Sequence, residues 1–460
     1  MAFEALAFLL ATACVAQEQY PKPLIHTSAD HPAGRVVLLE AGGLNAVDLA
    51  LWVESHPDSA MAELSHRGVT YTNAHVPWAD EAAGLVALVT GGTPVSTGIV
   101  SADGYDRALS PAGSACRTKG TTLMLDMDAV KMPLDPKHSC SPVAPHALLH
   151  VNNIFEVMSE KGARTAWAGT SAALTDLYAG SSGSGLSEAC NWAAPELGDK
   201  MRVTALLHWI DGKNCAGKLD AGVPVVMGIS FSAVSEAKMT AANNGYADAT
   251  GTPATELASA LESVDNSIAA IVRELKTKNL FDSTWIVVTA SYGKAPVTAR
   301  SIRTVNLSAL KAAAESMPHA VVSHISASGS AMVWLKDPSM TVLVTKALSA
   351  KASLLGIGEV VTGERLGLTM NLPTEDSRMP DIILRSRSDV RWVPAGRGSA
   401  TDEDAHVALL VSGVQLTGRL DKTPVPTTQL SPLLLRALGM EKFDLQALHR
   451  EHSPALPGIF

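Results

Sequence analysis

Short runs of apolar, often β-branched residues alternate with amphipathic helical stretches along most of the chain. Residues 36–39, 223–229 and 285–289 are typical of buried strands, and a long helix is predicted to begin near Thr252 and Pro253. Apolar residues of that helix recur every three or four positions, at Leu257, Leu261, Val264, Ile268, Ile271 and Leu275. Because strands that alternate with helices favour a mostly parallel sheet covered on both faces, we predict an α/β fold built as a single α/β/α sandwich.

Three further segments in the second half of the chain have the same strand-like character, at residues 331–335, 381–384 and 407–411. A last helix is predicted to open at Ser431 and Pro432 and to stop at Gly439. The flexible segment at residues 179–185 (AGSSGSG) has only seven residues, so it favours a surface loop over a domain linker. We therefore expect one domain from residue 17 to residue 460.

Composition excludes two broad classes of protein. Of the 460 residues, 47% are apolar and only 18% are charged, and the formal net charge is −9. Disordered chains are poor in apolar residues and rich in charge, so this chain is expected to fold. Neither the sign of the net charge nor any cluster of Lys and Arg fits a nucleic-acid-binding surface, so we expect no nucleic-acid partner.

The first residues resemble a secretory signal. Residues 5–16 (ALAFLLATACVA) form a largely apolar run of twelve, too short to cross a bilayer, with small residues at Cys14 and Ala16. We predict a signal peptide over residues 1–16, a secreted protein and no membrane anchor. Glu4 stands where a signal usually carries Lys or Arg, so a buried N-terminal helix is the alternative.

Removal of Cys14 with the signal leaves four cysteines, Cys116, Cys140, Cys190 and Cys215. An even number in an exported chain fits two disulfides. Pairing between neighbours in the sequence, Cys116 with Cys140 and Cys190 with Cys215, is the favoured one of three connectivities, and the sequence leaves the other two open. No Cys/His spacing in the chain is typical of structural zinc.

Generic catalytic motifs are absent from the sequence. It contains no GxxxxGK[ST] loop, no HExxH and no complete GxSxG. His146 and His150 have the four-residue spacing of two metal ligands on a helix, but no third ligand is evident, so ordinary hydrogen-bonded histidines are favoured. Reactive residues of such sheets gather where parallel strands end, and the loops there are therefore the places to search.

Those loops resemble a known family. The similar segments are residues 68–74 (GVTYTNA), 84–94 (GLVALVTGGTP), 150–157 (HVNNIFEV), 209–213 (WIDGK), 245–253 (GYADATGTP), 427–429 (TTQ) and 456–458 (LPG). In order and spacing they are similar to the type I phosphodiesterase/nucleotide pyrophosphatase branch of the alkaline phosphatase superfamily. The resemblance covers nearly everything from about residue 33 onward and implies an alkaline-phosphatase-like sandwich. It also implies a phosphoryl-transfer site in which Asp and His hold divalent metals, such as zinc, beside a Ser or Thr nucleophile.

Most of the family's site positions are occupied here by other residue types. Gly42 stands where the first metal-binding Asp is expected, and Glu81 stands where the nucleophile is expected. Asp248 retains a ligand position, whereas Tyr292 and Arg397 replace histidines. A catalytic divalent ion usually needs about three protein ligands. The resemblance therefore implies a catalytically degenerate member, with no cofactor predicted and Asp248 as the one retained metal ligand.

Three functions remain open at this point. The leading hypothesis is a secreted pseudoenzyme whose pocket binds a small phosphorylated ligand or a protein partner, or is merely filled by Glu81, Tyr292 and Arg397. The alternative is an active metal-dependent phosphoric ester hydrolase with displaced ligands such as Asp80, Glu81, Asp248 and a histidine from another loop. A hydrolase of another bond type would use Glu81 and Asp248 as a carboxylate pair about 5–10 Å apart.

Overall fold

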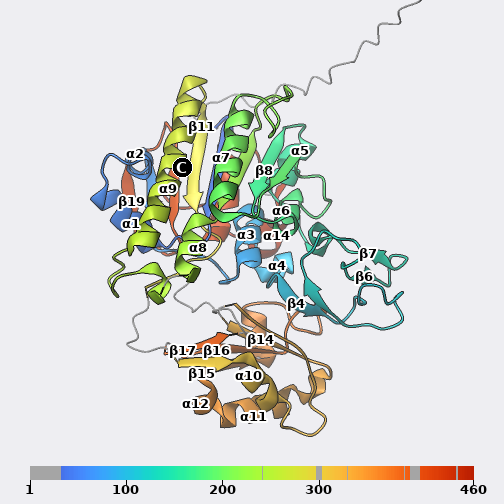
Figure 1. Ribbon diagram of the computed structural model, residues 1–460. Helices are drawn as coiled ribbons and strands as arrows, with labels where there is room; N and C mark the ends of the chain where they lie inside the picture. Colours follow the sequence, from blue (N-terminus) through green and yellow to red (C-terminus); the bar gives the residue numbers. More distant parts are fainter. Residues whose placement is uncertain are drawn as a thin grey trace, which may run out of the picture.

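The computed structural model describes residues 33–240, 242–296, 303–328, 330–387, 389–393, 405–441 and 444–459. Its centre is an eight-stranded sheet (Figure 1). In spatial order the strands are β19 (Arg419–Asp421), β2 (Gly68–Tyr71), β18 (Leu409–Ser412), β11 (Thr284–Thr289), β1 (Arg35–Ala41), β10 (Val226–Phe231), β8 (Thr165–Gly169) and β9 (Glu188–Asn191). Only β18 runs against its neighbours. The predicted mostly parallel sheet is therefore confirmed.

Helices cover both faces of this sheet, as expected from the alternation in the sequence (Figure 1). One group packs together on one face and consists of α1 (Ala46–Ser55), α2 (Ala60–His66), α7 (Pro195–Ile210), α8 (Ala233–Thr240) and α9 (Thr255–Thr277). A second group covers the other face and includes α3 (Glu81–Thr90), α5 (Ile154–Glu160) and α13 (Leu430–Ala437). The apolar face predicted for α9 is buried, from Leu257 to Leu275. These layers form the α/β/α sandwich.

The start of the long helix differs from the prediction. Helix α9 begins at Thr255, with Ala254 as its N-cap. Thr252 does not cap it, because its backbone N–H donates to the carboxylate of Asp248 at 3.1 Å. Pro253 forms a β-bridge with Tyr246 and lies before the first turn. Local hydrogen bonding by Asp248 therefore holds Thr252 in the preceding loop.

A second, smaller sheet lies beside the main body (Figure 1). Its strands are β13 (Val322–Ser328), β14 (Ser330–Leu335), β16 (Ile382–Ser386) and β15 (Ile357–Thr362), and all neighbours are antiparallel. Helices α10 (Leu307–Ala314), α11 (Thr341–Ala350) and α12 (Ala352–Leu355) cover one face, and Trp78, Ala83 and Val100 of the main body contribute to the core on the other. The strands predicted at residues 331–335 and 381–384 thus belong to this antiparallel sheet and not to the parallel one.

Both favoured disulfides are present. Cys116 bonds to Cys140 and Cys190 bonds to Cys215, closing sequence separations of 24 and 25 residues. The first joins two loops in the region of the short strands β4 (Asp103–Asp106), β5 (Thr121–Met124), β6 (Leu134–Asp135) and β7 (Ser141–Pro142). The second ties the edge strand β9 to the loop that follows α7. Within the described ranges, no helix is both long enough and apolar enough to cross a membrane.

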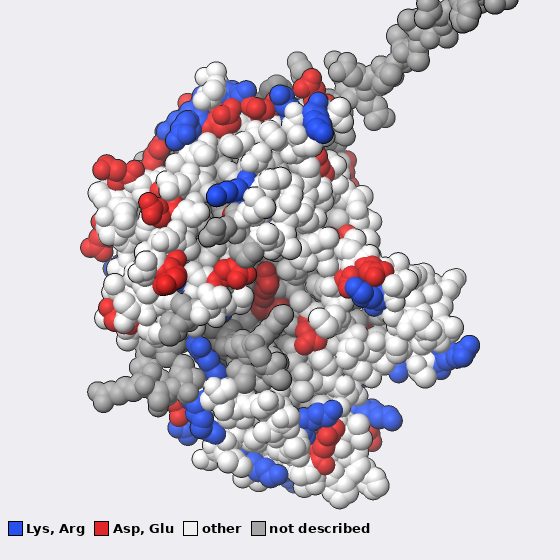
Figure 2. All heavy atoms as spheres, viewed as in Figure 1, with Lys and Arg blue, Asp and Glu red and all other residues white. Residues whose placement is uncertain are grey.

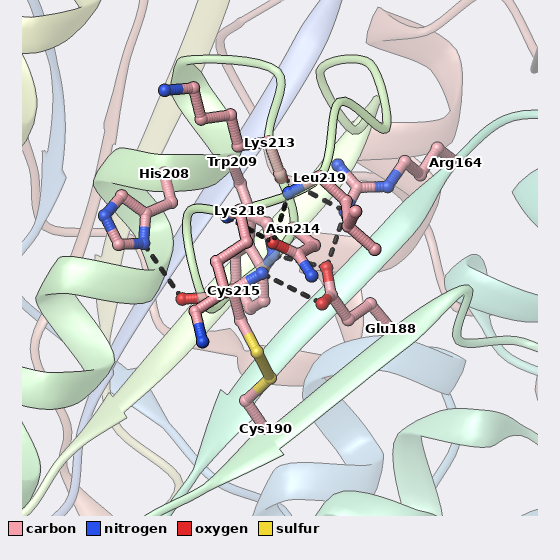
Figure 3. Close-up of a disulfide and its surroundings, with 10 residues drawn as sticks. All are labelled: Arg164, Glu188, Cys190, His208, Trp209, Lys213, Asn214, Cys215, Lys218 and Leu219. Atoms are coloured by element: carbon pink, nitrogen blue, oxygen red, sulfur yellow. Dashed lines mark hydrogen bonds and ion pairs between the residues drawn. A yellow bond between two sulfur atoms is a disulfide. The ribbon is translucent and has the colours of Figure 1, made fainter.

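A hydrogen-bond network surrounds the second disulfide (Figure 3). The carboxylate of Glu188 accepts from Arg164 Nη2 at 2.6 Å, from the indole of Trp209 at 2.7 Å and from the backbone N–H of Cys215 at 2.9 Å. Glu188, Cys190 and Cys215 are also the single set of three His, Cys, Asp or Glu residues close enough to share a metal in the described chain. The two sulfurs are bonded to each other, and the carboxylate already accepts three hydrogen bonds. These three residues therefore have a structural role.

Replacing Glu188 with glutamine is expected to lower the free energy of unfolding by about 1–2 kcal/mol. The substitution keeps the shape but removes the charge that strengthens three hydrogen bonds, to Arg164, Trp209 and Cys215. Urea unfolding followed by tryptophan fluorescence measures the change. Glu160→Gln, at the exposed end of α5, is the matched control and should stay within about 0.5 kcal/mol of the wild type. Equal effects of the two substitutions would contradict the prediction.

Candidate functional site

Gly42 and Tyr292 lie side by side at the edge where the central parallel strands end. Gly42 follows β1, Tyr292 follows the adjacent β11, and the backbone N–H of Gly43 donates to the carbonyl of Tyr292 at 2.9 Å. A Cβ atom built on Gly42 would lie 3.3 Å from Tyr292 Cε1 and 3.4 Å from its hydroxyl oxygen. The phenol in turn forms a 2.8 Å hydrogen bond with the hydroxyl of Ser235. The tyrosine ring therefore fills the space that a carboxylate at Gly42 would need.

Glu81 is the first residue of α3, and Asp80 is the N-cap of that helix. Asp80 Oδ1 accepts from the backbone N–H groups of Ala82 and Ala83 at 2.9 and 3.3 Å, and Oδ2 accepts from Ser101 at 2.9 Å. Such capping is the ordinary use of an aspartate at this position. The Asp80 carboxylate thus caps the N-terminus of α3, whereas the Glu81 side chain is solvent-exposed.

The first turn of α3 docks directly on the loop after β11. A Cβ atom at Gly84 would lie 1.8 Å from the carbonyl oxygen of Ser291, so only glycine permits this contact. Ser291 in turn donates from its backbone N–H and its hydroxyl to Glu40 Oε1, at 3.1 and 2.7 Å. The close contact brings the start of α3, and with it Glu81, to the same edge as Glu40 and Tyr292.

Glu40, Asp80 and Glu81 form an acidic cluster at this edge. Burial raises the pKa of Glu40, which is 3% exposed, although hydrogen bonds from Ser291 and Ser230 oppose the shift. The dense surroundings of Glu81, and then the charges of Glu40 and Asp80, raise its pKa to about 8. Figure 2 shows a hollow between the main body and the smaller sheet, with acidic side chains in and beside it.

Glu40 was not predicted from the sequence as a site residue. The available signal is one acidic residue within an otherwise apolar strand, RVVLLEA. Burying a carboxylate at the end of a central strand costs folding free energy unless the carboxylate is hydrogen-bonded. Such a residue therefore usually has a structural or functional role. The periodicity of the strand alone does not reveal which partners satisfy that carboxylate.

A buried lysine connects the loops behind Gly42. Lys238 of α8 is 1% exposed, and its ammonium group contacts Asp48 at 2.5 Å, the hydroxyl of Tyr246 at 2.6 Å and the carbonyls of Gly43 and Lys294 at 2.8 and 2.9 Å. The Tyr246 hydroxyl also donates to Asp48 Oδ1 at 2.8 Å. One cation thereby joins α1, α8 and the loops after β1 and β11. Sequence reasoning missed it, because a lone lysine in an amphipathic helix usually faces solvent.

Asp248 does not join this cluster in the described structure. The Asp248 carboxylate is exposed and accepts hydrogen bonds from Thr250 and Thr252 of its own loop, which lower its pKa. A Cβ at Gly251 of the same loop would meet Val47 of α1. Arg397 lies outside the described residues. Asp248 is therefore placed as the anchor of a surface turn.

The two spaced histidines have separate partners. His146 forms a 2.8 Å interaction with Asp176, which raises its pKa. His150 contacts Arg378, and burial together with the Arg378 charge lowers its pKa to about 4. The favoured interpretation of ordinary hydrogen-bonded histidines fits this geometry.

Comparison with solved structures identifies the same architecture in other proteins. Murine ectonucleotide pyrophosphatase/phosphodiesterase 5 is similar with a TM-score of 0.61 at 14% identity, over 89% of this chain and 96% of that one. An inactive variant of that murine protein, in complex with AMP, gives a TM-score of 0.60 at 14% identity over the same shares. The alkaline phosphatase PafA gives 0.60 at 11% identity, covering 89% of this chain and 96% of that one. At these identities the likeness shows an alkaline-phosphatase-like fold.

Comparison of the sequence with protein families identifies the family of this chain. No curated protein sequence matches it significantly. The family described as type I phosphodiesterase / nucleotide pyrophosphatase, in contrast, matches residues 36–406, which include the main sheet from β1 to β11 and the whole of the smaller sheet. This match spans well over half of the chain, and the similar solved structures have the same fold. The chain therefore belongs to the type I phosphodiesterase/nucleotide pyrophosphatase family.

Proposed function

We propose that this chain is an exported member of the family that does not hydrolyse phosphodiesters and instead binds a ligand at the degenerate site. The observation that carries the proposal is the packing of Tyr292 against Gly42, where its ring takes the space of the carboxylate that would hold a metal. Glu81, the first residue of α3, stands where the family resemblance implies the nucleophile. Both changes lie at the same edge of the sheet.

The residues present do not fit a catalytic metal centre. Gly42 offers no ligand atom, the phenol of Tyr292 is bonded to Ser235, and Asp248 is engaged by its own turn. Three ligands are needed at a typical catalytic divalent ion. The Glu81 carboxyl, with its pKa raised to about 8, is largely protonated at neutral pH and is therefore a poor nucleophile. We therefore derive no metal-assisted step for this chain.

Export is the second part of the proposal. The two disulfides support it, because such bonds form and persist mainly in oxidising compartments. The apolar run at residues 5–16 supports it independently.

The test is a metal and activity assay on purified full-length protein. We expect substoichiometric zinc by elemental analysis, and hydrolysis of bis-p-nitrophenyl phosphate that equals the buffer blank with or without added Zn²⁺. Glu81→Ala should leave that background unchanged. Stoichiometric metal with chelator-sensitive cleavage would contradict the proposal and establish the alternative, an active hydrolase with displaced ligands.

A further inference from the structure

Two histidines from distant parts of the chain lie directly opposite each other. His75 ends the short strand β3 (Ala74–His75), and it forms an antiparallel β-bridge with His406. Two backbone hydrogen bonds flank the pair, from the Val76 N–H to the Ala405 carbonyl at 2.9 Å and from the Val407 N–H to the Ala74 carbonyl at 3.0 Å. His75 and His406 are therefore a non-hydrogen-bonded pair, the arrangement in which facing residues approach most closely.

The two imidazoles lie on the same face of this bridge. Opposed residues of an antiparallel pair point to the same side, and in a non-hydrogen-bonded pair their Cα atoms are about 4.5 Å apart. His75 is half-buried, whereas His406 is exposed. Burial, and then the charge of His406, lowers the pKa of His75. His75 is therefore neutral at pH 7, which is the form of histidine that binds a metal.

Neighbouring segments hold the backbone of both histidines in place. The His406 carbonyl accepts from the side-chain amide of Asn45, the N-cap of α1, at 3.0 Å. A Cβ atom at Gly293 would lie 2.0 Å from the same carbonyl oxygen, so the loop after β11 packs directly against His406. On its other side His75 is in parallel register with Pro426 of β20 (Val425–Pro426). The two imidazoles are thus presented by a fixed backbone, which lowers the cost of binding a ligand between them.

We propose that His75 and His406 bind one Cu²⁺ ion through two imidazole nitrogens. Imidazole is a good ligand for first-row transition metals, and the affinity of such sites is highest for Cu²⁺. Cu²⁺ favours tetragonal coordination by nitrogen and oxygen, which two adjacent imidazoles and water supply. Among the residues that the structure describes, no carboxylate, thiol or further imidazole completes a three-ligand group with this pair. Zinc sites use three or four protein ligands, so Zn²⁺ should bind here much more weakly.

The copper site does not depend on the proposed function. The family resemblance assigns no role to His75 or His406, whereas the degenerate metal position is formed by Gly42 and Tyr292 on the loops after β1 and β11. Binding of Cu²⁺ is therefore expected whether or not the chain hydrolyses phosphodiesters. A copper measurement and the phosphodiesterase assay accordingly test separate statements.

The experiment is isothermal titration calorimetry with CuCl₂ on tag-free full-length protein that has been treated with EDTA and dialysed. Glycine in the buffer competes for copper and suppresses binding to single histidines. Pulsed electron paramagnetic resonance of the copper complex then counts the imidazole ligands. His75→Gln and His406→Gln each remove one imidazole. His66→Gln, at the exposed end of α2, is the matched control.

We expect one Cu²⁺ per chain with two imidazole ligands in the resonance spectrum. Either substitution in the pair should weaken binding by about tenfold or more, because the remaining imidazole no longer forms a chelate. His66→Gln should bind copper as the wild type does, and Zn²⁺ should bind about a hundredfold more weakly than Cu²⁺. Thermal unfolding without metal establishes that the variants fold. Because His406 is exposed, His406→Gln tests the proposal even if His75→Gln is unstable.

Three results would overturn the proposal. One is the absence of a stoichiometric copper site in the wild type. Another is unchanged copper affinity in His406→Gln, or a loss of affinity in only one of the two folded variants, since a chelate needs both imidazoles. The third is binding of Zn²⁺ as tightly as Cu²⁺, which would require a ligand set other than this pair.

Discussion

Replacing Lys238 with methionine is expected to lower the free energy of unfolding by about 3–5 kcal/mol. The ammonium group and the Asp48 carboxylate are both fully buried and lie 2.5 Å apart. Methionine keeps most of the side-chain length but leaves the Asp48 charge without its cation and removes the donor to the carbonyls of Gly43 and Lys294. Guanidinium unfolding followed by circular dichroism measures the loss.

A matched lysine separates this effect from a general loss of charge. Lys276 pairs with Glu63 at the same 2.5 Å, but both side chains are exposed, at 46% and 40%. Lys276→Met should therefore cost less than about 1 kcal/mol. The double variant Lys238→Met with Asp48→Leu removes both buried charges and should be more stable than Lys238→Met alone. Equal losses from the two lysines would show that the buried pair has no special role.

Lys238 also stabilises the loops that form the candidate site. Bound metals commonly join ligands from separate loops, and their binding free energy contributes to folding. In this chain Lys238 joins the loops after β1 and β11 at Gly43 and Lys294, next to Gly42 and Tyr292. A protein cation thereby fixes the loop geometry without an ion. These contacts hold this edge of the sheet together through a side chain of the protein itself.

The parallel part of the fold was predictable because it depends on local periodicity. Strands at residues 36–39 and 285–289 and the buried face of α9 follow from apolar spacing, which survives any change of site residues. The smaller antiparallel sheet was not predictable, because β14 and β16 have the same apolar character as the central strands. Sheet membership depends on long-range pairing, which a strand's own residues do not specify.

The site was predictable only where the family resemblance assigned positions. It singled out Gly42 and Tyr292, and the structure brings these two together. It also singled out Asp248, whose carboxylate the structure places in a local turn. Glu40 and Lys238 became visible only in three dimensions, since their roles depend on partners about 190 to 250 residues away along the chain. The role of a residue that depends on such distant contacts cannot be predicted from a single sequence.

Gly42→Asp is expected to destabilise the protein by about 2 kcal/mol through overpacking, and Tyr292→His should recover most of that loss. The backbone at Gly42 is outside the left-handed region, so the cost arises from the contact with the Tyr292 ring. Gly367→Asp, at an exposed position of the 3-10 helix η6 (Gly363–Leu368) where a Cβ meets only Leu372 at 3.6 Å, is the matched control and should change stability by less than about 0.5 kcal/mol. A double-mutant cycle from urea unfolding measures the coupling.

The same double variant should acquire affinity for zinc that the wild type lacks. Gly42→Asp and Tyr292→His would place a carboxylate and an imidazole on adjacent loops, and Glu40 already contacts the backbone of Ser291 beside them. A ligand at a hundred times its Kd adds about 2.7 kcal/mol of stability, so zinc should raise the Tm of the double variant by several degrees. Neither single variant should respond, because each supplies one new ligand. If the double variant shows neither steric coupling nor a zinc-dependent shift, Gly42 and Tyr292 are not a vacated metal position, and the proposed loss of catalysis would need another structural cause.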